Sequence, residues 1–115
     1  MNLLEEFFTL ILIVQILHSI EELSTGFHKK WYVFSMPFWV FLLFEIAFTG
    51  FWLLILLISD FSLRTTFQLT FIVFMFANGV QHLVWAGNVK KYVPGLLTAP
   101  FHIILFLTYF FQAVK

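Results

Sequence analysis

The chain has 115 residues, of which 62% are hydrophobic and 10% are charged, and its formal net charge at pH 7 is zero. Soluble domains have about half apolar and about a quarter charged residues, so this composition indicates a membrane protein, and the balanced charge gives no basic face for nucleic acid. The absence of cysteine excludes a disulfide framework and a thiolate site, which leaves histidine, carboxylate and amide groups as the available metal ligands.

Four apolar segments are close to the roughly 20 residues that a helix needs to cross a membrane. We predict helices over about 3–23, 37–59, 67–87 and 94–113. The first should remain as a helix in the mature protein, because Glu5 and Glu6 stand where a secretory signal would carry basic residues. Pro37 suits a helix start, where its missing N–H costs no hydrogen bond.

The fourth segment contains two prolines. Pro94-Gly95 is typical of a turn, yet a helix that began only at Thr98 would be short for a full span. We therefore expect a start at Pro94 or Gly95 and a kink at Pro100, whose ring frees the carbonyl of Leu96.

The connections between these segments are short, which favours antiparallel neighbours. We expect an all-α fold, a four-helix transmembrane bundle with up-down topology, and a single domain over residues 1–115. Four basic residues lie in the first and third loops and two on the opposite side, namely Lys29, Lys30, Lys90 and Lys91 against Arg64 and Lys115. Because cytoplasmic loops carry the excess of basic residues, both termini should lie outside the cytoplasm.

The first helix ends in the motif His18-Ser19-Ile20-Glu21-Glu22. Positions i, i+3 and i+4 share one face of a helix, so His18, Glu21 and Glu22 project together. A charged side chain at the bilayer centre costs roughly 2.5 to 3.5 kcal/mol. The cluster therefore needs a partner, unless the two glutamates only mark the cytoplasmic edge of the helix.

Polar residues from the other helices reach the same side of such a bundle. At about 1.5 Å per residue, Glu45, His82 and His102 lie roughly 9 to 12 Å inside it, at a depth similar to that of His18. Each also has a structural alternative, such as an interhelical hydrogen bond. The predicted metal ligands are His18, Glu21, His82, Glu45 and His102; the predicted catalytic groups are Glu22 and Asn78; and the supporting residues are Gln15, Pro94, Gly95 and Thr98.

Imidazoles and carboxylates in a bundle core suit one or two divalent metal ions, such as Zn²⁺, Fe or Mn²⁺. Our leading hypothesis is a metal-dependent hydrolase or oxidoreductase that acts on a lipophilic substrate at the cytoplasmic end of the bundle. Glu22 would act as general base, and Asn78 would orient a ligand or donate to an oxyanion. The alternatives are a proton- or metal-coupled transport or binding module, which would require a homo-oligomer, and a structural subunit of a membrane complex.

Three ordered motifs connect the chain to a known family. His18-Ser-Ile-Glu21-Glu22, Asn78-Gly-Val-Gln-His82 and Tyr92-Val-Pro94-Gly95-Leu-Leu-Thr98 resemble the HxxEE, NxxxH and YxPGxxT motifs of the HXXEE domain family of small bacterial membrane proteins. The resemblance covers nearly the whole chain and implies a bacterial cell membrane location. It implies no particular activity, and it does not extend to Glu45 or His102.

Overall fold

The computed structural model describes residues 2–115, which form five helices and no strand. The helices are α1 (Leu3–Ser24), α2 (Phe27–Lys30), α3 (Phe38–Leu57), α4 (Arg64–Val89) and α5 (Ala99–Ala113). Within residues 2–115, three helices are long and apolar enough to span a membrane, namely α1, α3 and α4, with 22, 20 and 26 residues. The all-α prediction is confirmed, and the three candidate spans indicate a membrane protein.

Local signals explain where the first helices begin. The side chain of Asn2 accepts a hydrogen bond from the Glu5 backbone N–H at 2.7 Å, which caps α1. Glu5 and Glu6 in the first turn also interact favourably with the helix dipole. Between α1 and α3, the short helix α2 occupies part of the segment expected as a loop, and Gly26 precedes it with a φ of 82°.

The fourth predicted helix is shorter than expected. α5 begins at Ala99, so the predicted start at Pro94 or Gly95 is wrong. The predicted kink is also wrong, because Pro100 lies in the first turn, where no helical hydrogen bond is lost. Residues 94–98 form turns instead, and Gly95 has a φ of 94°, a left-handed conformation that glycine adopts without strain. With 15 residues, α5 is apolar but short.

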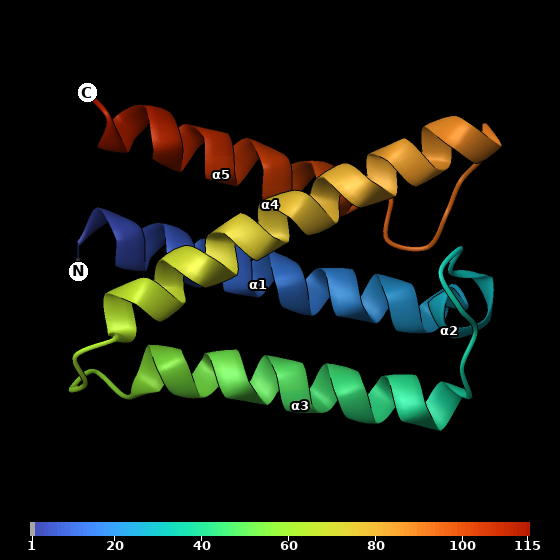
Figure 1. Ribbon diagram of the computed structural model, residues 1–115, viewed down its shortest axis with the longest axis horizontal. Helices are drawn as coiled ribbons and strands as arrows, with labels where there is room; N and C mark the ends of the chain where they lie inside the picture. The colour runs from blue at the N-terminus through green and yellow to red at the C-terminus, as the bar shows by residue number, and fades with distance from the viewer. Residues whose placement is uncertain (1) are drawn as a thin grey trace.

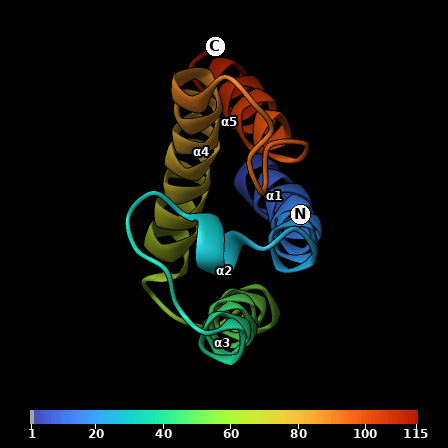
Figure 2. The same ribbon diagram turned by 90° about the vertical axis from the view of Figure 1, so that its right-hand side faces the viewer.

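The four longer helices extend along the long axis of the molecule (Figure 1), and α1 contacts each of the other helices. Both termini lie at one end, while α2 and the connection between α4 and α5 lie at the other. Seen from that second end, α3 and α5 are on opposite sides of α1 and α4 (Figure 2). The C-terminal ends of α1 and α4, which carry His18 and His82, thus lie on the same side of the molecule, as predicted.

Two apolar clusters fill the core. The larger is built by α1, α3 and α4 from Phe8, Ile11, Leu12, Trp52, Ile55, Phe71, Ile72 and Met75, and the smaller consists of Phe27, Phe41, Trp85 and Val93. The outward faces are apolar too: Leu17, Ile46 and Leu57 are 52%, 60% and 69% exposed. Such faces suit hydrocarbon rather than water. The unusual feature of the interior is a set of buried polar side chains, which define the candidate site.

Candidate metal centre

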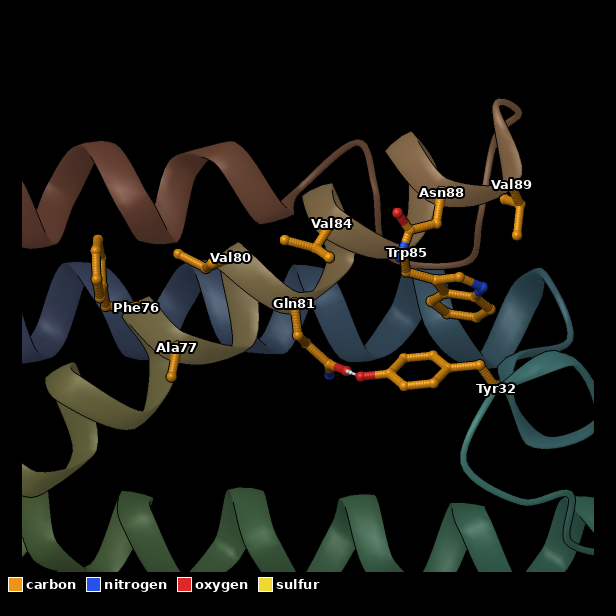
Figure 3. A pocket seen from close by; sticks show the side chains of 9 residues that line it. All are labelled: Tyr32, Phe76, Ala77, Val80, Gln81, Val84, Trp85, Asn88 and Val89. Atoms are coloured by element: carbon orange, nitrogen blue, oxygen red, sulfur yellow. Dashed lines mark hydrogen bonds between the residues drawn. The ribbon is translucent and has the colours of Figure 1, made fainter.

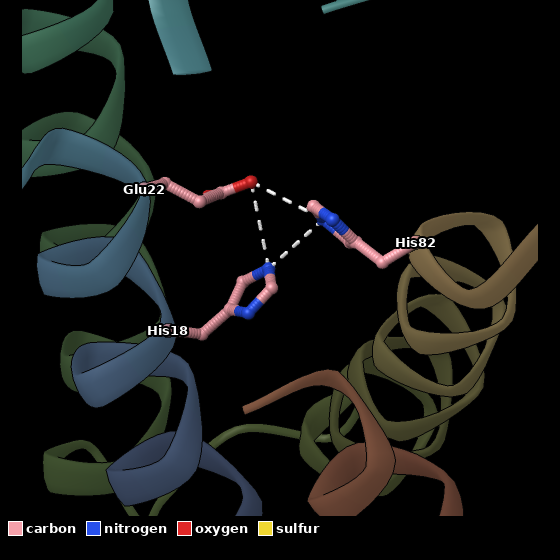
Figure 4. A group of neighbouring side chains, drawn as sticks. All are labelled: His18, Glu22 and His82. Carbon is pink, nitrogen blue, oxygen red and sulfur yellow. Dashed lines mark hydrogen bonds and ion pairs between the residues drawn. The ribbon is translucent and has the colours of Figure 1, made fainter. Parts of the chain in front are cut away.

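Three buried side chains from α1 and α4 each direct one donor atom to a common point (Figure 4). His18 Nε2 lies 3.1 Å from His82 Nε2 and 3.5 Å from Glu22 Oε2, and His82 Nε2 lies 3.2 Å from the same oxygen. Both imidazoles are fully buried, and Glu22 is 4% exposed. The structure thus brings His18 and His82 together, as predicted from their similar depth along the helices.

The three separations fit a divalent ion. Ligand atoms of a tetrahedral ion at about 2.1 Å lie about 3.4 Å from one another, close to the measured 3.1, 3.5 and 3.2 Å. A circle through the three atoms has a radius of about 1.9 Å, so one divalent ion would be within bonding distance of all three. The donors are also the right chemical types, because imidazole and carboxylate both bind zinc, iron and manganese.

Hydrogen bonds hold His18 in the orientation of a ligand. The Thr98 hydroxyl donates to Glu21 Oε1 at 2.7 Å, so it is an acceptor toward His18 Nδ1, 2.6 Å away. The proton of His18 is then on Nδ1, and its Nε2 presents a lone pair to the cluster. Asn78 Nδ2 lies 3.2 Å from that Nε2 and can donate to its lone pair, a hydrogen bond that a metal ion bound to Nε2 would replace.

His82 is held less completely. Its Nδ1 is buried and has no hydrogen-bond partner among the described residues. Its position therefore depends on packing and on the cluster itself: its ring lies 4.6 Å from the His18 ring and 6.0 Å from those of Phe27 and Trp85. His82 Nε2 can donate to Glu22 or present a lone pair.

Glu21, a predicted ligand, faces away from the three donor atoms. Its carboxylate accepts hydrogen bonds from the Tyr92 hydroxyl, from the backbone N–H groups of Leu97 and Thr98, each at 3.0 Å, and from the Thr98 hydroxyl. Neighbouring helical residues point about 100° apart, so only Glu22 of the pair faces His82. Burial raises the pKa of the Tyr92 hydroxyl, and its hydrogen bond to Glu21 raises it further.

The other two predicted ligands also lie beside the cluster rather than in it. Glu45 accepts a hydrogen bond from Ser19 Oγ, and His102 Nε2 lies 3.0 Å from Gln15 Oε1. Gln15 Nε2 in turn lies 3.3 Å from Ser19 Oγ. Both groups lie near the predicted depth, but rotation about each helix axis directs Glu45 toward Ser19 and His102 toward Gln15. His18, Glu22 and His82 alone form the three-donor group within residues 2–115.

The segment between α4 and α5 closes over the imidazoles. Pro94 and Gly95 are buried. A Cβ atom at Gly95 would lie 2.5 Å from His82 Cε1 and 2.7 Å from His18 Cε1. Glycine is therefore required here for close approach as well as for its positive φ. The supporting roles expected for Gly95 and Thr98 have a physical basis in these contacts.

A cavity of about 540 Å³ adjoins the cluster between α1, α3 and α4. Its polar lining residues are Gln15, Glu22, Glu45, Asn78 and Gln81, and its other walls are apolar. A second cavity of about 600 Å³ lies along another side of α4 and is almost entirely apolar (Figure 3). Gln81 borders both.

Sequence reasoning missed three residues of this polar network. Gln81 donates to Asn78 Oδ1 at 3.0 Å and accepts from the Tyr32 hydroxyl at 3.0 Å. Ser19 and Tyr92 donate to Glu45 and Glu21. All three residues stand inside the quoted motifs, and the i, i+3 spacing of Asn78 and Gln81 was a further signal.

These features define a class: a helical membrane protein with a buried histidine and glutamate cluster. The family model described as "Protein of unknown function with HXXEE motif" matches residues 9–110, so the chain belongs to the HXXEE family. No curated protein and no solved structure matches the chain. His18 and Glu22, the first and last residues of the HXXEE motif in this chain, are two of the three members of the cluster.

Proposed function

We propose that this protein is an integral membrane metalloenzyme, in which His18, Glu22 and His82 hold a divalent metal ion beside a cavity that takes a lipophilic substrate. The observation that carries the proposal is the three-donor group: one atom from each residue, all within 4.8 Å of one another and all buried. Glu22, expected from the sequence to be a general base, has the geometry of a ligand.

The remaining polar groups have positions that suit supporting roles. Thr98 and Glu21 hold His18, and Asn78 borders both the cluster and the cavity, where its amide can donate to a polar group of the substrate. Glu45, on the α3 wall of the same cavity, is placed to exchange a proton with substrate. A bound zinc or manganese ion would supply Lewis-acid chemistry for hydrolysis, whereas a bound iron would supply redox chemistry.

The cavity supports a lipophilic substrate. Its volume of about 540 Å³ is in the range of small-molecule sites, and those are mostly apolar with a few placed polar groups. Aromatic and aliphatic side chains form most of its lining. Glu22 belongs both to the donor group and to the cavity lining, so a substrate in the cavity would lie next to the ion.

We also propose four membrane crossings in an up-down bundle, the fourth made by α5 together with residues 94–98. A 15-residue helix rises only about 22 Å, so the preceding turns would complete the span. Lys29, Lys30, Lys90 and Lys91 lie at the end opposite to the termini. The preference of basic residues for the cytoplasm would place the metal centre near that face of a bacterial cell membrane, with both termini outside.

Ion passage is the competing function. Toward the end that carries the termini, beyond the buried Gln15, the core contains Phe8, Ile11, Phe71 and Ile72, each 0% exposed. A charged ion passing through such packing in a single copy would pay a large desolvation cost. This packing favours chemistry at a closed site over transport, and transport would require an oligomer of the chain.

Elemental analysis of protein purified in mild detergent tests the proposal. Wild type should carry bound metal, and His18→Ala, His82→Ala and Glu22→Gln should lose it. His28→Ala is the matched control, because His28 lies in α2 outside the donor group. His102→Ala should keep the metal as well, since its Nε2 faces Gln15.

Two results would overturn the proposal. One is wild-type protein that retains no metal after incubation with zinc, manganese or iron and removal of the excess. The other is flux of protons or metal ions in proteoliposomes that disappears in Glu22→Gln, which would assign the cluster to transport.

A further inference from the structure

We infer that the cavity between α1, α3 and α4 binds a single-chain amphiphile with a protonated amine head, and that Glu45 recognises this head. The inference rests on the proposed function, because it names the substrate class of the same site. It stands on three features of the cavity: its charge, its aromatic lining and its size.

The charged side chains that line the cavity are all acidic. The lining contains two carboxylates, Glu22 and Glu45, and no lysine or arginine. Glu22 has two imidazoles beside it, whereas Glu45, 6% exposed, has Ser19 as its only hydrogen-bond donor within residues 2–115. No lysine or arginine of that range pairs with either carboxylate. A buried carboxylate is stabilised by a cation in direct contact with it, and an ammonium group on a ligand would place a cation at Glu45.

The residues around Glu45 favour a cation with an apolar chain. Phe41 and Phe48 lie one turn before and one turn after it on α3, and both line the cavity. An ammonium group over an aromatic face is stabilised by about 0.5 to 2 kcal/mol. The other aromatic lining residues are Phe27, Trp31, Phe34 and Phe44. A carboxylate framed by aromatic rings thus suits an amine head, and the remaining rings suit its hydrocarbon chain.

The size of the cavity suits a ligand with one hydrocarbon chain. A water molecule takes up about 30 Å³ of liquid, and with about that space for each heavy atom a cavity of about 540 Å³ holds roughly 18 heavy atoms. An alkylamine with 12 to 16 carbons has about that number. A two-chain phospholipid has more than twice as many heavy atoms, so only part of it would fit inside.

Binding of radiolabelled dodecylamine to protein in nanodiscs of zwitterionic lipid tests the inference, with dodecanol as the uncharged competitor. We expect saturable binding of the amine, and the alcohol should compete at least about tenfold more weakly, a difference equal to about 1.4 kcal/mol. Glu45→Gln should weaken amine binding by about the same factor while keeping the wild-type metal content, which shows that the variant is folded. Glu6→Gln, the same change at an exposed carboxylate of α1, should bind like wild type.

Equal binding of amine and alcohol, or unchanged amine binding in Glu45→Gln, would overturn the inference. Its failure is distinguishable from failure of the proposed function because metal content is measured separately. A stoichiometric metal without selective amine binding leaves the metal centre intact and refutes the amine. Selective, Glu45-dependent amine binding in protein that never retains metal supports the amine site and refutes the metalloenzyme.

Discussion

Replacement of Gly95 by alanine should separate metal binding from helix formation. Gly95 lies before α5 with a φ of 94°. An added Cβ would lie 2.5 Å from His82 Cε1, 2.9 Å from His82 Nδ1 and 2.7 Å from His18 Cε1. Non-bonded carbon atoms settle at about 3.5 to 4.0 Å, so the segment or the two rings must move apart by about 1 Å.

A movement of that size is large for a metal centre and small for a fold. Metal–ligand distances must match to within about 0.2 Å, whereas a left-handed residue costs alanine roughly 1 to 2 kcal/mol. Domains of ordinary stability, about 5 to 15 kcal/mol, survive that cost. We therefore expect Gly95→Ala to keep its helices and to bind metal about 100-fold more weakly, the upper end of the effect seen when groups that orient ligands are removed.

Competition with a chromogenic chelator measures the metal Kd, and circular dichroism measures the helix content. Gly87→Ala is the matched control, because Gly87 lies on α4 and an added Cβ meets nothing within 4 Å. The control should bind metal like wild type. A Gly95→Ala protein with the wild-type Kd would refute the close approach of this segment to the imidazoles, and with it the donor geometry.

Three further predictions concern residues outside the donor group. Thr98→Val removes the acceptor of His18 Nδ1 and should weaken metal binding about 10- to 100-fold in the same chelator assay, while Thr98→Ser should restore it; equal affinity in both would contradict the orienting role. Arg64 donates to carbonyls at the end of α3, so Arg64→Met should lower stability in thermal unfolding by about 2 kcal/mol or more without changing metal affinity. A loss of metal in this variant would contradict the expectation that the two ends of the molecule act independently. The pKa of Tyr92 is raised in the folded protein, so its contribution to stability is present below about pH 10 and is lost as the pH rises through the folded value. Wild-type Tm should therefore fall more steeply than that of Tyr92→Phe above about pH 10, and parallel curves would show that the hydroxyl does not titrate in the transition.

The sequence was sufficient to predict the all-α class and the depth of the site along the helices. Apolar length predicts the membrane helices, and counting residues from their ends predicts that His18 and His82 reach one depth. It was not sufficient for the start of α5, because Pro100 fits either a kink or a first turn. The left-handed Gly95 and its contact with two imidazoles decide between these, and they depend on tertiary packing.

The direction in which each side chain points around its helix axis was the second feature that the sequence pattern did not predict. The spacing of His18, Glu21 and Glu22 places all three on one broad face, but a donor group needs them within a much narrower angle. Glu22 faces His82, while Glu21 faces the segment before α5. Partners on other helices make that choice, and a single sequence does not reveal them.

The two adjacent glutamates therefore have different tasks, and this difference explains why the three motifs occur together. Glu22 supplies a donor atom, while Glu21 holds the segment that carries Gly95 and Thr98. That segment in turn packs against the imidazoles, and its Thr98 hydroxyl accepts the hydrogen bond that places the His18 proton on Nδ1. The α1 and α4 motifs contact each other directly, and loss of the motif before α5 would leave His18 without the acceptor of its Nδ1 proton and the imidazoles without the segment that packs against them.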